Sequence, residues 1–168
     1  MDTSNDPIFF ANSQIGLAGE TARHKFNSWF YKLPLDSIDK RMESPYCGTF
    51  VSWCFDQAKQ PLGIIDYLNG YCSVPNAAKH YTGLNLMTKT PVRNCIVFYN
   101  WQGNLSNTAL LEHTGIFEKD SGDGKTFVSI EGNTSGVGGD QSNGGCVFRK
   151  VRYYSTSLFA NPFKNQIV

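Results

Sequence analysis

Apolar residues recur along the first third of the chain at the three- and four-residue spacing of helices. One such run covers residues 7–31, and its apolar positions are Ile8, Phe9, Ile15, Leu17, Phe26, Trp29 and Phe30. A second run follows Ser44, which suits an N-cap, with Pro45 at the first helical position. Pro61 ends this run, because proline cannot continue a helix. We therefore expect two helical regions, joined by a polar connection over residues 32–43.

The second half of the chain has a different pattern. Residues 60–91 are mixed and contain one short helix, after which runs rich in β-branched and aromatic residues predict strands. The predicted strands cover residues 95–101, 113–119, 126–132 and 146–154. Helices followed by an antiparallel sheet indicate an α+β fold, with the N-terminal helices packed on the sheet. The 168 residues suffice for one domain with a real core, and we expect one, spanning residues 1–168.

Charge and composition exclude several classes of partner. Charged residues make up 17% of the chain and the net charge is +1, so bulk charge attracts neither nucleic acid nor a membrane. No apolar run approaches the length of a membrane span. The first 16 residues lack the basic start and apolar core of a signal peptide. We expect a protein made in the cytoplasm that leaves its cell by lysis or through a dedicated secretion apparatus.

The five cysteines are an odd number. No C-x-x-C pair, His/Cys cluster or H-E-x-x-H motif gives metal-ligand spacing, so we expect neither a metal nor a cofactor. With Cys47 set aside, the other four are either free or joined in up to two bridges, and the sequence does not fix their connectivity. These four are Cys54, Cys72, Cys95 and Cys146.

Two of the five cysteines, Cys47 and Cys54, lie in the predicted helix "SPYCGTFVSWCF". Cys47 falls in its first turn, where free N–H groups and the positive end of the helix dipole favour a thiolate. Cys54 lies two turns further along, beside Phe50, Val51 and Phe55, and is expected to be an inert core residue. The segment alone fits Cys47 as a nucleophile or as a small core residue. A partner has to decide between the two.

His113 is the expected partner, since it opens a predicted strand. If the hairpin with the next strand is symmetric about Gly122, Glu131 stands directly opposite His113, with Cβ atoms ~5 Å apart on one face. A carboxylate there accepts the imidazole N–H and fixes the tautomer. The alternative is an exposed cross-strand pair with no function. His24 and His80 are more typical of surface or satisfied core histidines.

Several segments together resemble the CHAP family, named for cysteine, histidine-dependent amidohydrolases/peptidases. They are "YCGTFVSWCFDQA", "CIVFYNWQG", "EHTGIFEK", "SIEGNTSG" and "NGGCVFRKVRYY", and the resemblance covers about residues 8–154. It implies a papain-like α+β fold and cleavage of amide bonds in peptidoglycan. Under it the nucleophile matches Cys47, the base His113 and the orienting acid Glu131, while Asn133 matches a further polar position of the site.

The chain also departs from the family pattern. Tyr46 stands where the family often has tryptophan or glutamine, and it is expected to pack or to line the cleft. Tyr46 and Ser44 are the candidates for substrate contact and for a second oxyanion donor beside the N–H of Cys47. Asn94 and Cys95 replace the usual Gly-Asp before a strand, and the acidic calcium loop of some phage relatives has no match.

These observations predict a monomeric cysteine amidase or endopeptidase that cuts the stem peptide or cross-link of peptidoglycan. Since the catalytic domain needs about 150 residues, little remains for a wall-binding module, which favours thin, directly cross-linked peptidoglycan in the periplasm or cell wall of a target bacterium. The expected setting is a phage endolysin or an interbacterial effector with an immunity protein. The alternatives are a glycan-cleaving enzyme using Glu112 or Glu131, a non-catalytic wall protein, and an acyl transferase or deamidase with the same triad.

Overall fold

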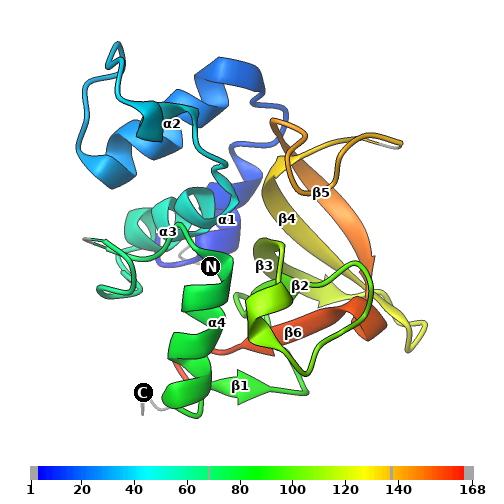
Figure 1. The fold of residues 1–168 in the computed structure, drawn as a ribbon. Helices are drawn as coiled ribbons and strands as arrows, with labels where there is room; N and C mark the ends of the chain where they lie inside the picture. Colours follow the sequence, from blue (N-terminus) through cyan, green and yellow to red (C-terminus); the bar gives the residue numbers. More distant parts are fainter. Residues whose placement is uncertain (1–3, 68, 137, 165–168) are drawn as a thin grey trace.

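The computed structural model describes residues 4–67, 69–136 and 138–164 (Figure 1). Its helices, in chain order, are α1 (Pro7–Asn12), α2 (Gly19–Tyr31), the 3-10 helix η1 (Lys40–Glu43), α3 (Cys47–Gln57), α4 (Val74–Gly83), and the 3-10 helices η2 (Thr108–Leu110) and η3 (Tyr154–Thr156). Its strands are β1 (Met87–Thr88), β2 (Ile96–Tyr99), β3 (His113–Asp120), β4 (Thr126–Thr134), β5 (Cys146–Tyr153) and β6 (Ser157–Ala160). Within these ranges no helix has the length and apolarity of a membrane span.

The described strands form one six-stranded sheet in the order β1-β6-β2-β3-β4-β5, in which all neighbours are antiparallel. The α-helices lie to one side of this curved sheet (Figure 1), and α3 packs against β3 and β4. The predicted α+β, papain-like class is confirmed. The sequence pattern predicted neither β1 nor β6.

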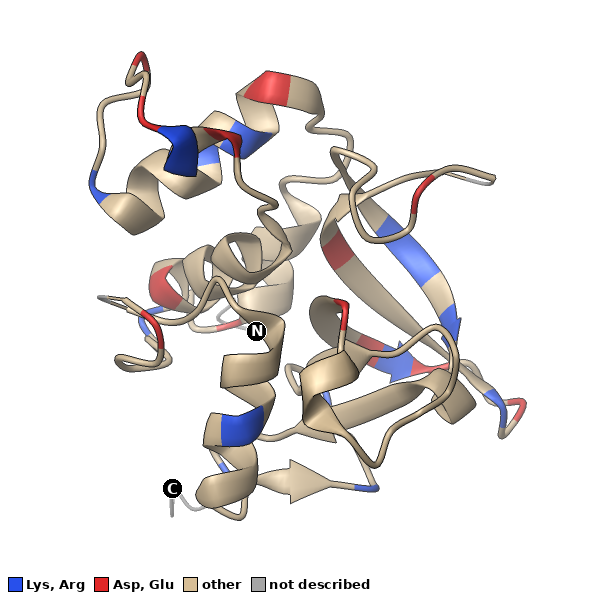
Figure 2. Ribbon diagram, in the orientation of Figure 1, with Lys and Arg blue, Asp and Glu red and all other residues tan. Residues whose placement is uncertain are grey.

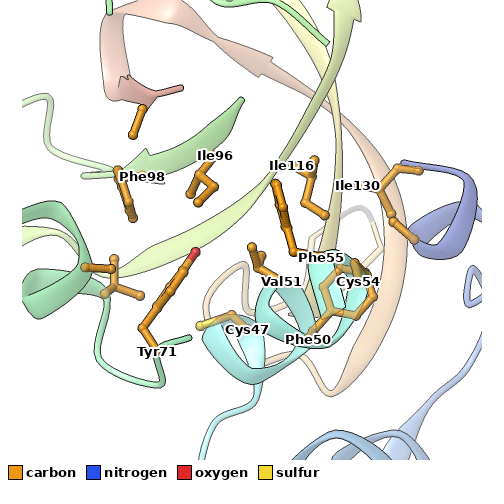
Figure 3. Packing of buried hydrophobic residues seen from close by; sticks show 14 of the residues in the cluster. Cys47, Phe50, Val51, Cys54, Phe55, Tyr71, Ile96, Phe98, Ile116 and Ile130 are labelled. Atoms are coloured by element: carbon orange, nitrogen blue, oxygen red, sulfur yellow. The ribbon is translucent and has the colours of Figure 1, made fainter. Parts of the chain in front are cut away.

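Two apolar clusters occupy the two faces of the sheet. On the helix side, Phe50, Val51 and Phe55 of α3 pack with strand residues such as Ile116 and Ile130 (Figure 3). The other face carries a second cluster, made of Cys95, Val97, Tyr99, Phe117, Phe127 and Phe159. His113 pairs with Tyr99 across β2 and β3, and therefore belongs to this second face.

The single helix predicted over residues 7–31 is two helices. Between them Gly16 has φ 92°, a left-handed value that favours glycine. The N–H of Gly16 donates to the carbonyl of Val147, and the N–H of Val147 donates to the carbonyl of Leu17. The helix is interrupted because this stretch hydrogen-bonds to β5 instead.

The start of α3 also differs from its prediction. Ser44 is not its N-cap and Pro45 is not its first residue, because the helix begins at Cys47 with Tyr46 as the N-cap. Ser44 instead follows η1 in an extended conformation, which suits a residue before proline. At the other end α3 stops at Gln57, and Lys59 has a left-handed φ of 57°. The predicted end before Pro61 is confirmed.

Candidate active site

Cys47 is the first residue of α3, and its predicted place in the first turn is confirmed. The first backbone hydrogen bond of the helix runs from the N–H of Phe50 to the carbonyl of Tyr46, at 2.8 Å. The three preceding N–H groups therefore have no acceptor within the helix. Figure 3 shows Cys47 at the beginning of α3, beside Tyr71 and ahead of the apolar side chains of the helix.

Asn27 of α2 fixes the chain that leads into the nucleophile. Its buried amide nitrogen donates to the carbonyls of Arg41, Met42 and Ser44, at 3.2, 3.1 and 2.9 Å. Its amide oxygen accepts a hydrogen bond from the hydroxyl of Thr49, in the first turn of α3, at 2.8 Å. One buried side chain thus joins α2, the loop after η1 and the start of α3. Asn27 was not predicted, because nothing local in the sequence distinguishes it from a surface asparagine.

The segment around Tyr71 packs tightly against the nucleophile's turn. A Cβ atom at Gly48 would lie 2.9 Å from the carbonyl oxygen of Tyr71, so only glycine fits next to Cys47. The hydroxyl of Ser52 accepts the N–H of Tyr71 at 2.9 Å. The phenol of Tyr71 bonds to the hydroxyl of Thr114 at 2.8 Å, and Thr114 donates onward to the carbonyl of Val97. These contacts connect α3 to β3 beside His113.

His113 begins β3 and is fully buried. Its ring stacks on Tyr99, with centroids 5.7 Å apart, and lies 5.9 Å from the ring of Trp101. Its Nε2 contacts Oε2 of Glu131 at 3.1 Å, whereas its Nδ1 has no hydrogen-bond partner among the described residues. Burial lowers the pKa of His113, but interactions with Cys47 and Glu131 outweigh burial and raise it to about 9. The ring therefore lies between Cys47 and Glu131.

The predicted direct pairing of His113 with Glu131 is wrong. Ile116 pairs with Ile130, and continuing this register places Gly115 opposite Glu131. The two site residues are thus offset by two positions along their strands. An offset of two keeps side chains on one face, so the predicted contact forms along a diagonal.

A β-bulge between Phe117 and Lys119 makes this contact possible. Near the turn, Asp120 pairs with Phe127, and this register alone would set Glu131 and His113 on opposite faces. The bulge shifts the register by one residue and restores the shared face. The hairpin assumed from the sequence was symmetric about Gly122. It therefore lacked this bulge, and its turn centre differs from the observed one.

Gly115 makes room for the carboxylate. A Cβ atom there would lie 2.6 Å from Cγ of Glu131 and 3.0 Å from the carbonyl oxygen of Ile130. No real Cβ atom tolerates such contacts without a shift of its neighbours. Glycine at this position therefore lets the Glu131 side chain cross β3 towards His113.

The carboxylate of Glu131 is fully buried and accepts four hydrogen bonds. Oε1 accepts from the hydroxyl of Ser129 at 2.7 Å and from Nε of Arg152 at 2.8 Å. Oε2 accepts from Nη2 of Arg152 at 2.5 Å and from Nε2 of His113 at 3.1 Å. Burial raises the pKa of Glu131, but the hydrogen bonds from Arg152 and His113 outweigh it and lower the pKa to about 2. Since an ionised carboxylate only accepts, Nε2 of His113 carries a proton.

Arg152 of β5 is a site residue that sequence analysis missed. It stands opposite Phe127 in the sheet, and its guanidinium reaches along the shared face to Glu131. In Figure 2 basic positions on β5 lie beside an acidic position on β4. A buried arginine in a strand run is a signal for a buried acid. The partner could not be identified, because the loop between β4 and β5 leaves their register open.

Asn133, which the resemblance assigns to a further polar position of the site, bonds through its side chain to the loop after β4. Its side-chain nitrogen donates to the carbonyl of Ser142 at 3.0 Å and to Oδ1 of Asn143 at 3.1 Å. Its φ of 60° accompanies a second bulge, where β4 shifts register against β5. Among the described hydrogen bonds, none joins its side chain to Cys47 or His113. Asn133 holds the loop that follows β4.

Tyr46 packs in the core, which is one of its two expected roles. Tyr46 is fully buried and stacks on Phe26, with centroids 5.6 Å apart, so it packs and has no exposed surface for a substrate. Its hydroxyl has no hydrogen-bond partner among the described residues. Ser44 is half-buried, and its carbonyl is already bonded to Asn27. Its burial leaves Tyr46 no surface for substrate contact, and the expected role of Ser44 stays a prediction.

All five cysteines lie within the described residues and are free. Cys54 is fully buried, and burial raises its pKa well above the usual range, which confirms it as a core residue. Burial also raises the pKa of Cys72 and of Cys95. No group of three or more His, Cys, Asp and Glu residues in the described part of the chain is placed to hold a metal ion.

A family model described as the CHAP domain matches residues 39–133. The matched range contains Cys47, His113 and Glu131, while α1, α2 and Arg152 lie outside it. No curated protein and no solved structure matches the chain. Because the family match spans more than half of the 168 residues, this protein belongs to the CHAP domain family.

Proposed function

We propose that this protein hydrolyses an amide bond in the peptide part of peptidoglycan, in the stem peptide or its cross-link. Membership of the CHAP family supports a peptidoglycan hydrolase of the amidase type in general. The observation that carries the proposal is the His113 ring, which is held at Nε2 by Glu131 and is free at Nδ1 for Cys47. That arrangement matches the nucleophile, base and orienting acid of covalent acyl transfer.

In the proposed reaction the sulfur of Cys47 attacks the carbonyl carbon of the substrate amide. Below its pKa of about 9, His113 is an imidazolium, which stabilises negative charge on the neighbouring sulfur. The tetrahedral intermediate collapses as the C–N bond breaks, and the leaving amine takes the Nδ1 proton. A thioester between Cys47 and the acyl group remains.

Water completes the cycle. His113, now neutral, removes a proton from water at Nδ1, and the hydroxide attacks the thioester carbon. The C–S bond breaks, and the products are a carboxylic acid, which loses its proton to water, and the regenerated Cys47–His113 pair. The N–H of Cys47, at the start of α3, is the proposed donor to the oxyanion in both steps. Since Cys47 is 4% exposed and His113 is fully buried, the substrate approaches from the sulfur side.

Digestion of purified sacculi tests this proposal. Mass spectrometry of the digest is expected to show fragments with one new free amine and one new carboxylate at a single type of peptide bond, with intact glycan strands. Cys47→Ala protein is the control and should release none of these fragments. Cleaved glycan strands, or equal release by the variant, would contradict the proposal.

The proposed site of action is the periplasm or wall of a target bacterium, as for an endolysin or an interbacterial effector. Expression in a Gram-negative host, once in the cytoplasm and once with a periplasmic leader, tests it. Lysis is expected from the periplasmic form only, and not from its Cys47→Ala variant. Activity confined to thick walls with interpeptide bridges would contradict the expected substrate.

A further inference from the structure

We propose that Arg152 is a positioning residue of this site, which locks the Glu131 carboxylate in the orientation that leaves Nε2 of His113 protonated and Nδ1 open to Cys47. The catalytic meaning of this role rests on the proposed function. The role itself concerns the imidazole ring, and it can be measured without a substrate.

The geometry of the Arg152–Glu131 pair carries the proposal. Nε and Nη2 bond to separate carboxylate oxygens at 2.8 and 2.5 Å, which is a bidentate pair. With the hydroxyl of Ser129 on Oε1, both lone pairs of that oxygen are used, and on Oε2 one position is left for His113. A rotation of the carboxylate would break two charge-assisted hydrogen bonds. His113 therefore meets a fixed acceptor.

Arg152 is itself held from several sides. Its guanidinium lies over the rings of Trp101 and Tyr99, 4.8 and 5.5 Å from their centroids. Nη1 donates to Oε1 of Gln141 at 3.0 Å, and Nη2 also donates to the hydroxyl of Thr134 at 3.3 Å. Because the same two aromatic rings contact His113, Arg152 is packed into the wall of the site.

Arg149, on the same strand, forms an exposed ion pair with Glu118 and serves as a comparison. It bonds to Glu118 through Nε at 2.7 Å, but its side chain is 45% exposed, whereas Arg152 is buried. An exposed pair contributes little and changes little when lost. Removing one partner of a buried pair leaves an uncompensated charge and a mobile carboxylate. Arg149 thus offers a matched control on β5.

Lysine separates positioning from charge. Arg152→Lys would keep the positive charge but supply a single donor point in place of the planar fork. If orientation is what matters, Arg152→Lys loses most of what Arg152→Met loses. If charge alone matters, Arg152→Lys behaves as the wild type does.

The first test reads the tautomer of His113 by 15N NMR, in Cys47→Ala protein at a pH where the ring is neutral. The chain has three histidines, so the ring signals can be assigned by substitution. With Arg152 present we expect a protonated Nε2 and an unprotonated Nδ1. Arg152→Lys and Arg152→Met should give averaged shifts of the two nitrogens, and Arg149→Met should leave them unchanged. An unchanged tautomer in both Arg152 variants would overturn the proposal.

The second test is kinetic and uses the native Cys47. Both Arg152 variants should lose about 10- to 100-fold in kcat/KM, as is typical for residues that orient a site residue, and Arg149→Met should lose none. If Arg152 acts through Glu131, the double variant Glu131→Gln/Arg152→Met is no slower than Glu131→Gln alone. Additive losses, or full activity in Arg152→Lys, would refute positioning.

Folding does not confound this result. Should Arg152→Met fail to fold, Arg152→Lys and the double variant Glu131→Gln/Arg152→Met still test positioning. Thermal unfolding checks that each of them is folded. If the wild type cleaves no peptide bond, the proposed function fails while the NMR result still decides the role of Arg152.

Discussion

The proposed nucleophile and its proposed base lie in regions built in different ways. Cys47 lies at the start of one helix, whose apolar face packs on the sheet through Phe50, Val51 and Phe55. His113 and Glu131 lie on the opposite face of the sheet, in a polar network that spans β3, β4 and β5. Local sequence determines the first region, whereas strand register, one bulge and a distant arginine determine the second.

This difference predicts two kinds of mutational damage. A truncation in the apolar region removes contacts and lowers the free energy of unfolding. A substitution in the polar network changes a proton, a charge or an orientation, and so affects activity before stability, unless it leaves a buried charge unpaired. Variants of each region can therefore confirm or break the contrast.

The largest expected effect is that of Cys47→Ala. In the proposed reaction the sulfur of Cys47 forms the new bond, so the variant's kcat/KM should fall on the order of 10³-fold or more. Its thermal unfolding midpoint should stay close to that of the wild type. The matched control on the same helix is Cys54→Ala, which should keep activity and lose about 1–2 kcal/mol of stability, because Cys54 is fully buried. The reverse pattern would show that the wrong cysteine has been assigned.

His113→Ala should be as damaging as Cys47→Ala, because the pair acts as a unit. The double variant should then be no slower than either single variant, when all three are assayed on the same sacculi. Losses that multiply in the double variant would mean that the two residues act independently.

Glu131→Gln should have a smaller effect on activity, about 10- to 100-fold, because its amide oxygen can still accept the Nε2 proton. It should have a larger effect on stability than Cys54→Ala, because it leaves the bidentate pair of Arg152 without a negative partner. Chemical denaturation and kcat/KM together check this. Wild-type stability and activity in this variant would mean that Glu131 has neither role.

The helix that carries Cys47 was predicted well because its signals are local. A first-turn cysteine, an apolar helical face and a proline after the helix lie close together in the sequence. The structure differs at the helix start, where Tyr46 is the cap in place of Ser44 and Cys47 the first residue in place of Pro45. The order of helices and strands was predictable for the same reason. The strand β6, which lies between β1 and β2 in the sheet, was not predicted.

The polar network could be predicted only in part. His113 and Glu131 were found, but their register was wrong by two positions, and the contact survives because an even offset keeps the face. The bulge after Phe117 leaves no local mark in the sequence. Arg152 was beyond reach, since residues 135–145 separate its strand from that of Glu131 and hide their pairing.

Gly115→Ala tests the diagonal contact directly and should have a smaller effect than Glu131→Gln. The added Cβ would lie 2.6 Å from Cγ of Glu131, so the carboxylate must shift away from His113, and we expect a loss of about 10-fold in kcat/KM. Gly83→Ala is the control, since its Cβ meets nothing within 4 Å and its φ is ordinary. Equal activity in the two variants would show that Glu131 reaches His113 without needing the space.

The last prediction concerns the pH dependence of stability. The pKa of His113 rises on folding, from its ordinary value of 6.5 to about 9, so its contribution is complete below about pH 6.5 and disappears as the pH rises through about 9. The pKa of Glu131 falls from 4.5 to about 2, so its contribution is complete above about pH 4.5 and is lost only at strongly acid pH. The free energy of unfolding should therefore decline between pH 7 and 9 in the wild type, and less so in His113→Gln. Urea denaturation at each pH measures this difference.

Since Cys47 is one of the groups that raise the pKa of His113, the decline should move to lower pH in Cys47→Ala. An identical decline in wild type and His113→Gln would mean that the buried imidazole does not hold its proton more tightly in the folded protein.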